Sequence, residues 1–136
     1  MTPPRVDFRS PRWLWWPVVV QLAIIFAASS IPNLRHLPGD ISDKAGHSTG
    51  YAMLGALLLR ALAGGRLQGV TWKRAIAAIV LSTLYGVSDE LHQLFVPGRS
   101  ADPYDVLADS VGATIAASIG WLLGLARRWG ILGSSS

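Results

Sequence analysis

Four long apolar segments, each close to 20 residues, restrict the folds that this chain can adopt. They run over residues 13–30, 44–64, 75–96 and 103–126. About 20 apolar residues is the length that an α-helix needs to cross the hydrocarbon core of a bilayer. The segments are too long and too uniformly apolar for barrel strands, and only helices or closed barrels satisfy the backbone in lipid. The sequence therefore predicts an all-α fold, an integral membrane four-helix bundle.

The composition agrees with this prediction. Hydrophobic residues make up 51% of the 136 residues and charged residues 15%, and the mean hydropathy is +0.38. These values favour a membrane protein over a soluble domain. The length suits one domain, expected over residues 13–128, between a cytoplasmic tail at 1–12 and a C-terminal tail at 129–136. The chain has no cysteine, which excludes disulfides, Cys-based metal sites and thiol nucleophiles.

The first apolar segment has a second interpretation. A basic stretch precedes it and the small residues "AASS" end it, as in a cleaved signal peptide. Pro17 and three tryptophans are unusual in a signal core, whereas Trp13, Trp15 and Trp16 fit an aromatic belt at a membrane interface. We therefore expect a transmembrane helix, and cleavage would leave the topology of the other three unchanged.

The basic residues predict the orientation. With four spans, one side of the membrane receives nine of the twelve: Arg5, Arg9, Arg12, Arg60, Arg66, Lys73, Arg74, Arg127 and Arg128. The positive-inside rule places that side, and both termini, in the cytoplasm. We expect a multi-pass membrane protein, with the lipid bilayer as its surroundings. The basic residues are scattered in ones and twos and form no stripe, so no nucleic-acid binding is expected.

Acidic residues gather at the opposite side. Asp7 alone is expected in the cytoplasm, while the other seven of the eight acids and all three histidines fall on or just below the outer face. Residues 88–112, "SDELHQLFVPGRSADPYDVLADSVG", contain five of those acids. Ionisable residues at membrane depth are costly, and they commonly mark functional sites. The pattern predicts a site at the extracytoplasmic end of the bundle.

Asp89 and Glu90 lie in the third segment, eight and seven residues before Pro97, or about 10 Å from the expected helix end. A charged carboxylate near the centre of a membrane helix costs on the order of 2.5–3.5 kcal/mol. A neighbouring cation or proton would offset that cost. Alternatively, the two acids reach the headgroups or pair with Arg99. Because Gln93 follows Glu90 at i+3 and His92 follows Asp89 at i+3, at least one of these pairs should point into the bundle.

The fourth segment opens with "SADPYDVLADSVG". Asp102 has the position of an N-cap, Pro103 that of the first helical residue, and Asp105 that of a capping-box acid. Capping does not explain Asp109, one turn deeper on the same face. Small residues continue that face towards the other end and predict a close helix contact inside the bundle: Gly112, Ala116, Gly120 and Gly124.

The second segment places Asp43, His47 and Tyr51 on one helix face, at i, i+4 and i+8. Either Ser42 or Asp43 could be only an N-cap. His47 is a satisfied core residue, a proton shuttle or a metal ligand. No HExxH-type pair is present, so the sequence predicts no definite metal site and leaves the cofactor open.

Together these residues resemble the VanZ-like family of small integral membrane proteins. The resemblance rests on "SSIP", "DKAGHSTGYAMLG" and "YGVSDELHQLFVPGRSADPYDVLADSVGA", and it covers about residues 29–125. Asp109 stands where we expect an asparagine in the family pattern, which adds a charge. The resemblance implies a location in the bacterial inner membrane and an association with resistance to teicoplanin, a glycopeptide antibiotic that acts outside the membrane.

Three functions compete for these residues. The first is a binding protein for an envelope component, such as a lipid or a peptidoglycan precursor, linked to glycopeptide (teicoplanin) resistance. The second is a membrane enzyme for a lipid-linked or phosphate-bearing substrate, and the third is a small transporter. The candidate acid–base groups are Glu90, His47 and Asp105. The candidate substrate-binding residues are Asp43, Lys44, Tyr51, Asp89, Gln93, Arg99, Asp102 and Asp109.

Overall fold

The computed structural model describes residues 10–32 and 40–131, with side chains described from residue 45 onward in the second range. The described residues form four α-helices and no strand, so the prediction of an all-α chain is confirmed. The helices are α1 (Pro11–Ser29), α2 (Asp40–Leu62), α3 (Trp72–Gln93) and α4 (Pro103–Arg128). A short 3₁₀ helix, η2 (Leu67–Gly69), lies between α2 and α3.

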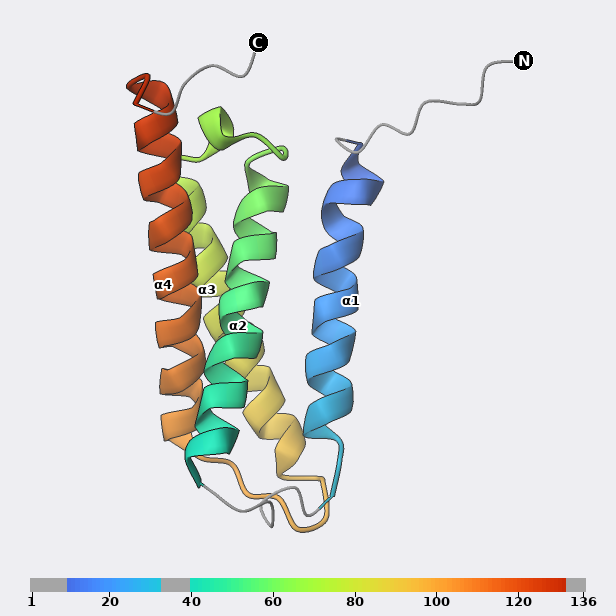
Figure 1. Cartoon of the computed structure of the whole chain (residues 1–136). Coiled ribbons are helices and arrows are strands. Elements are labelled where there is room, and N and C mark those ends of the chain that lie inside the picture. The colour runs from blue at the N-terminus through green and yellow to red at the C-terminus, as the bar shows by residue number, and fades with distance from the viewer. Residues whose placement is uncertain (1–9, 33–39, 132–136) are drawn as a thin grey trace, which may run out of the picture.

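The four helices run up and down beside one another, each antiparallel to the next along the chain (Figure 1). Helices α2, α3 and α4 are packed together, and α4 makes its most extensive contacts with α2. Helix α1 packs beside α2 and α3, and several long-range hydrogen bonds hold it there. Gln21 Nε2 donates to the Gly50 carbonyl at 3.0 Å, and Tyr85 Oη donates to the Leu22 carbonyl at 2.8 Å.

Helix α3 ends at Gln93, three residues before the end that the apolar run predicted. A helical Pro97 would lack an N–H group, and its ring would clash with the carbonyl of Gln93, four residues earlier. The chain turns instead, and Gly98 takes the left-handed conformation, with φ 76°. Asp89 and Glu90 therefore lie in the last turn of the helix, about 5 Å from its end, and the expected 10 Å was wrong.

The other helix ends follow local chemistry. Helix α3 begins at Trp72 because the Thr71 side chain accepts a hydrogen bond from the Arg74 amide at 3.3 Å. Asp102 caps α4 as predicted, accepting from the Tyr104 amide at 2.9 Å. Helix α2 begins at Asp40, so Ser42 and Asp43 lie inside its first turn and the N-cap interpretation of either residue is wrong.

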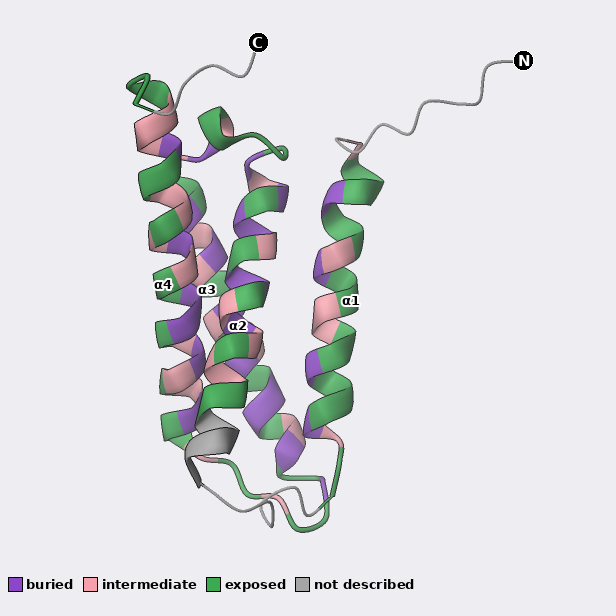
Figure 2. Ribbon diagram, in the orientation of Figure 1, coloured by how far each residue is buried: buried purple, intermediate pink, exposed green. Residues whose placement is uncertain are grey.

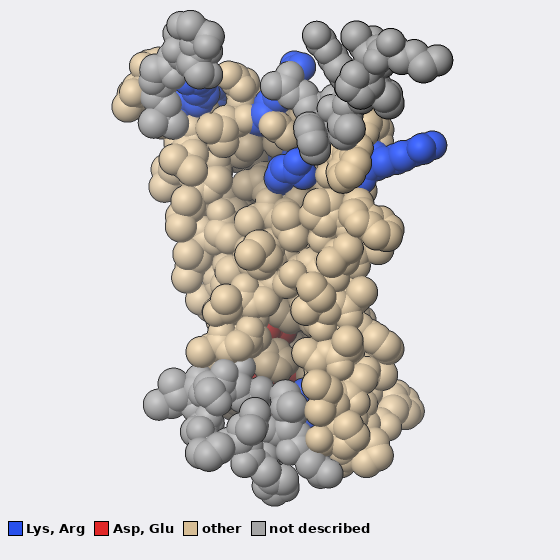
Figure 3. Space-filling model, turned by 45° about the vertical axis from the view of Figure 1, so that its right-hand side comes forward, with Lys and Arg blue, Asp and Glu red and all other residues tan. Residues whose placement is uncertain are grey.

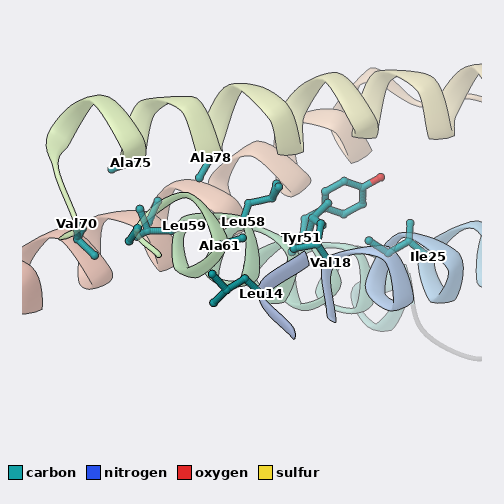
Figure 4. Packing of buried hydrophobic residues seen from close by; sticks show 13 residues of the cluster. Leu14, Val18, Ile25, Tyr51, Leu58, Leu59, Ala61, Val70, Ala75 and Ala78 are labelled. Atoms are coloured by element: carbon teal, nitrogen blue, oxygen red, sulfur yellow. The ribbon is translucent and has the colours of Figure 1, made fainter. Parts of the chain in front are cut away.

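Small residues allow the helices to approach closely. A Cβ atom at Gly112 of α4 would collide with the Ser48 carbonyl of α2, and one at Gly55 would meet the Ala113 backbone at 3.0 Å. The predicted small-residue face of α4 thus packs on α2 within the bundle. An apolar core follows it, from Val70 at one end to Ile25 at the other (Figure 4).

Exposed residues line the outer faces of the bundle (Figure 2), and many of them are large and apolar. Leu84 is 60% exposed and Leu107 58% exposed, and other large apolar residues are exposed along α1, α3 and α4. Aromatic and basic residues gather where α1 and α3 begin and where α4 ends. We name this the basic end; its described members include Trp13, Trp16, Trp72 and Trp129, with Arg12, Arg60, Arg66, Lys73, Arg74, Arg127 and Arg128.

By length and composition, two helices of the described chain are apolar enough to cross a membrane: Pro11–Ser29 and Pro103–Arg128. Helices α2 and α3 contain more polar and charged residues than α1, and in α3 several of these are buried. Helix α3, for example, buries Ser82, Asp89, Glu90 and Gln93. The apolar runs in the sequence had predicted four such spans.

The close approach of α4 to α2 generates a test. Gly112→Ala adds a methyl group against the Ser48 carbonyl, and we expect a loss of about 1–3 kcal/mol in stability, the usual cost of overpacking. Gly46→Ala on α2 is the matched control, because nothing lies within 4 Å of its added Cβ. Thermal unfolding in detergent should show a lower midpoint for Gly112→Ala only. Equal midpoints for both variants would contradict the described helix contact.

Candidate functional site

A group of polar side chains is buried at the end opposite the basic end. We name it the acidic pocket; its described members are His47 and Tyr51 of α2, Asp89, Glu90 and Gln93 of α3, and Asp105 and Asp109 of α4. Asp109 is 0% exposed and Glu90 5% exposed. Figure 3 shows acidic atoms deep in an opening near this end, with a basic side chain beside them. Three helices thus contribute side chains to the pocket.

The buried face of α3 shows why the acids point inward. Towards the basic end this face carries Ala75, Ala78, Ser82 and Gly86, which are small and buried. Asp89, Glu90 and Gln93 continue the same stripe at helical spacing. The helix packing that buries the small residues therefore also buries these three polar ones.

Asp89 is tied to the end of α1. Ser29 Oγ lies 2.6 Å from Asp89 Oδ2 and 2.9 Å from the Ile25 carbonyl, and Gln93 Nε2 lies 3.4 Å from the same Asp89 oxygen. Ser29 is not among the residues that the sequence predicts for the site. It follows the buried residues Val18 and Ile25 at spacings of eleven and four, and this periodicity could have placed it.

Glu90 accepts hydrogen bonds at both carboxylate oxygens. The Asp102 amide donates to Oε2 at 2.8 Å, and Gln93 Nε2 donates to Oε1 at 3.2 Å. Asp102 is the N-cap of α4, so Glu90 joins the end of α3 to the start of α4 across the 94–102 connection. Glu90 therefore has a structural role besides any chemical one.

Asp109 lies deepest in the pocket. Its Oδ1 is 3.4 Å from His47 Nδ1, and neither carboxylate oxygen reaches hydrogen-bond geometry with a described partner. Its other oxygen rests against Gly86 of α3, where an added Cβ would lie 3.0 Å from Oδ2. Gly86 therefore makes room for a carboxylate between the helices, which sequence analysis did not foresee.

His47, Glu90 and Asp105 come together as the sequence predicted. Each offers one donor atom, and the three atoms lie within 4.8 Å of one another. The His47 side chain is 11% exposed, and Asp105 is 7% exposed. An imidazole and two carboxylates at this separation can exchange protons or hold a cation.

The remaining candidates lie around this centre. Tyr51 is 1% exposed, and its hydroxyl has no hydrogen-bond partner among the described residues. The hydroxyl points away from Leu58 (Figure 4). Arg99 is half-buried and donates to the Ala28 carbonyl at 3.3 Å, next to the Ser29 that binds Asp89. Asp102 is half-buried at the start of α4. The side chains of Asp43 and Lys44 lie outside the described residues.

His92, which follows Asp89 at i+3, faces α1 instead of the pocket centre. Its ring stacks on Phe26 with centroids 4.4 Å apart, and its Nε2 lies 3.0 Å from Ser30 Oγ. Of the two predicted pairs on α3, Glu90 and Gln93 both lie in the pocket. In the other pair, Asp89 lies in the pocket whereas His92 faces α1. His36, the third histidine expected at this end, lies outside the described residues.

Comparison with known proteins agrees with this arrangement. A family model described as VanZ/LLP1 matches residues 12–124, most of the chain. The chain belongs to the VanZ/LLP1 family. The matched range contains every described residue of the acidic pocket, and the family resemblance inferred from sequence is confirmed. No curated protein and no solved structure matches the chain.

The two bonds of Glu90 generate a test of its structural role. Glu90→Ala removes the acceptor of a half-buried amide and should cost about 1–3 kcal/mol in stability. Glu90→Gln keeps an acceptor for that amide, so its thermal unfolding midpoint in detergent should stay much nearer that of the original chain. If the two variants unfold at the same temperature, the bond between Glu90 and the Asp102 amide does not contribute.

Proposed function

We propose that this VanZ/LLP1 family protein is a multi-pass protein of the bacterial inner membrane, a four-helix bundle with both termini in the cytoplasm. Its acidic pocket opens to the extracytoplasmic side and binds an envelope component, either a lipid or a peptidoglycan precursor. Through that binding the protein contributes to resistance to glycopeptides such as teicoplanin. The observation that carries the proposal is a cluster of buried carboxylates inside a bundle whose outer surface is apolar.

The distribution of polarity supports a membrane setting. In water, a small bundle would be expected to bury its leucines and to expose its acids. This bundle exposes Leu84, Leu107 and Ile115, and it buries Asp89, Asp105 and Asp109. Family membership and the two helices long enough to span a bilayer also suggest a membrane protein. Arginines and tryptophans at the basic end are typical of a cytoplasmic interface.

The pocket offers complementary chemistry for a polar headgroup. Buried carboxylates accept hydrogen bonds from hydroxyl or ammonium groups, and charge-assisted bonds of this kind are strong. Arg99 lies beside α1 at the same end and has a buried Nε without a hydrogen-bond partner among the described residues. A guanidinium suits a phosphate or a carboxylate. Headgroups of envelope lipids and precursors combine these two kinds of group.

The link to resistance rests on location. A glycopeptide acts on the outer face of the envelope, and the acidic pocket opens to that face in the proposed orientation. A protein that binds a lipid or a precursor there changes what the antibiotic can reach. The VanZ/LLP1 assignment supports this link through the family association stated above.

A membrane enzyme is the second candidate, and one observation favours it. Glu90, His47 and Asp105 lie close enough for proton transfer through one another or a substrate. In that mechanism Glu90 is the general acid or base and His47 the second proton-transfer group. Both oxygens of Glu90 already accept hydrogen bonds from Gln93 and Asp102, which favours a fixed binding group over a proton carrier.

Mass spectrometry of copurified lipids tests the binding proposal. The full chain, purified in mild detergent, should carry one lipid or precursor class enriched over its abundance in the membrane. Glu90→Gln removes the negative charge with little change in shape and should reduce that enrichment at least tenfold. Ser88→Ala, on the exposed face of the same helix end, is the matched control and should retain the ligand.

The same experiment separates the two candidate functions. If Glu90→Gln still retains the ligand but no longer converts it to a product seen with the original chain, the enzyme is favoured. Equal lipid profiles for the original chain, both variants and the bulk membrane would refute a specific envelope ligand.

A further inference from the structure

We propose that His47, Glu90 and Asp105 form a binding site for a divalent first-row transition-metal ion, Zn²⁺ in the first instance, and that Asp109 orients His47 towards the ion. The sequence predicted no definite metal site, because the three ligands lie far apart in the chain and come from three different helices. The inference goes beyond the proposed function and does not depend on which envelope component the pocket binds.

The geometry of the three donors fits one ion. One nitrogen of His47 and one oxygen each of Glu90 and Asp105 lie within 4.8 Å of one another. Donors bound to a zinc ion at about 2.0–2.2 Å lie up to about 3.5 Å apart. Side-chain movements of about 1 Å therefore bring all three donors to bonding distance, without any change in the helix packing.

Asp109 is an independent indication of a ligand. Its carboxylate is fully buried at the pocket centre, and neither oxygen has a hydrogen-bond partner among the described residues. Its Oδ1 lies 3.4 Å from Nδ1 of His47. With Nδ1 turned to Asp109, the other ring nitrogen, Nε2, is directed elsewhere. A carboxylate behind a histidine is the usual way in which proteins orient a metal-binding imidazole.

Glu90 is held in place as a ligand usually is. Its two hydrogen bonds, from the Asp102 amide and from Gln93, fix the carboxylate between α3 and α4. Each carboxylate oxygen has two lone pairs, so an oxygen that accepts one hydrogen bond can still bind an ion. Asp105 lies in the first turn of α4, close to the Asp102 cap that Glu90 contacts. A backbone amide thus holds the Glu90 carboxylate in position, and the start of α4 places Asp105 beside it.

The charge and donor set select the class of ion. Asp89, Glu90, Asp105 and Asp109 are all at most 7% exposed, and a divalent cation offsets much of the cost of burying them together. One imidazole with carboxylates suits zinc, manganese or iron, whereas calcium and magnesium sites use oxygen donors alone. Three protein ligands leave a coordination position for water or for a ligand group, as in open zinc sites.

Direct metal measurement tests the site. The full chain, purified without a histidine tag, is stripped with a chelator, titrated with ZnCl₂ and followed by calorimetry and elemental mass spectrometry. We expect one Zn²⁺ per chain and a higher unfolding temperature with the ion bound. Asp105→Asn should weaken Zn²⁺ binding by at least about 100-fold, because loss of a ligand exceeds the 10–100-fold effect of losing an outer partner.

Asp89→Asn is the matched control. It removes the same charge from the same cluster and keeps an acceptor for Ser29, but Asp89 is not among the three converging donors. Its Zn²⁺ affinity should change less than about tenfold. An original chain that binds no Zn²⁺ at millimolar concentration overturns the proposal. Equal losses in Asp89→Asn and Asp105→Asn overturn it too, because they indicate attraction by charge without coordination.

Cobalt spectroscopy covers the case in which Asp105→Asn does not fold. Co²⁺ added to the stripped original chain should give visible absorption bands that ZnCl₂ abolishes, and the absence of these bands contradicts the site.

Asp109→Asn tests the positioning role. It should weaken Zn²⁺ binding about tenfold and shift the cobalt bands. Unchanged bands would restrict Asp109 to packing and refute its role in orienting His47.

Discussion

The cost of burying carboxylates inside an apolar bundle is the constraint on which the rest of the structure depends. An unpaired buried charge is strongly destabilising, so each acid needs a donor, a cation or a proton. Ser29 and Gln93 approach Asp89, and the Asp102 amide and Gln93 serve Glu90. Asp109 has His47 alone at 3.4 Å. The number of hydrogen-bond donors thus decreases towards the centre of the pocket. There the proposed ion or headgroup supplies the missing positive charge or hydrogen bonds.

Fold and pocket are built by the same contacts. Gly112 and Gly86 allow α4 to approach α2 and α3 so closely that the carboxylate of Asp109 fits between the helices. Ser29 joins α1 to the pocket through Asp89, and Glu90 joins α3 to the start of α4. A substitution in the pocket therefore affects packing and binding together. For this reason the tests compare variants that preserve shape, such as Glu90→Gln and Asp105→Asn.

Helical periodicity in the sequence was sufficient to predict which faces meet. The spacing of Asp105 and Asp109, followed by Gly112, indicated a buried face on α4, and the structure buries all three. Contacts between distant segments could not be predicted in this way. Ser29 bonds Asp89 across 60 residues and Glu90 bonds the Asp102 amide across a turn, and neither contact has a local pattern. The early end of α3 could have been inferred from Pro97, whose ring excludes a helical carbonyl at Gln93.

The central claim is that the acidic pocket is a polar cavity within the membrane that opens to the extracytoplasmic side. Cysteine accessibility in right-side-out membrane vesicles tests this claim most directly. The chain has no cysteine, so each variant carries a single thiol. The labelling reagent is a positively charged thiosulfonate that does not cross the membrane. His47→Cys should react from outside. Leu107→Cys lies at similar depth but is exposed on the lipid-facing surface of α4, so it should not react. Gln68→Cys at the basic end should react only after the vesicles are permeabilised. Equal reaction of the first two, or reaction of Gln68→Cys in sealed vesicles, would contradict the account.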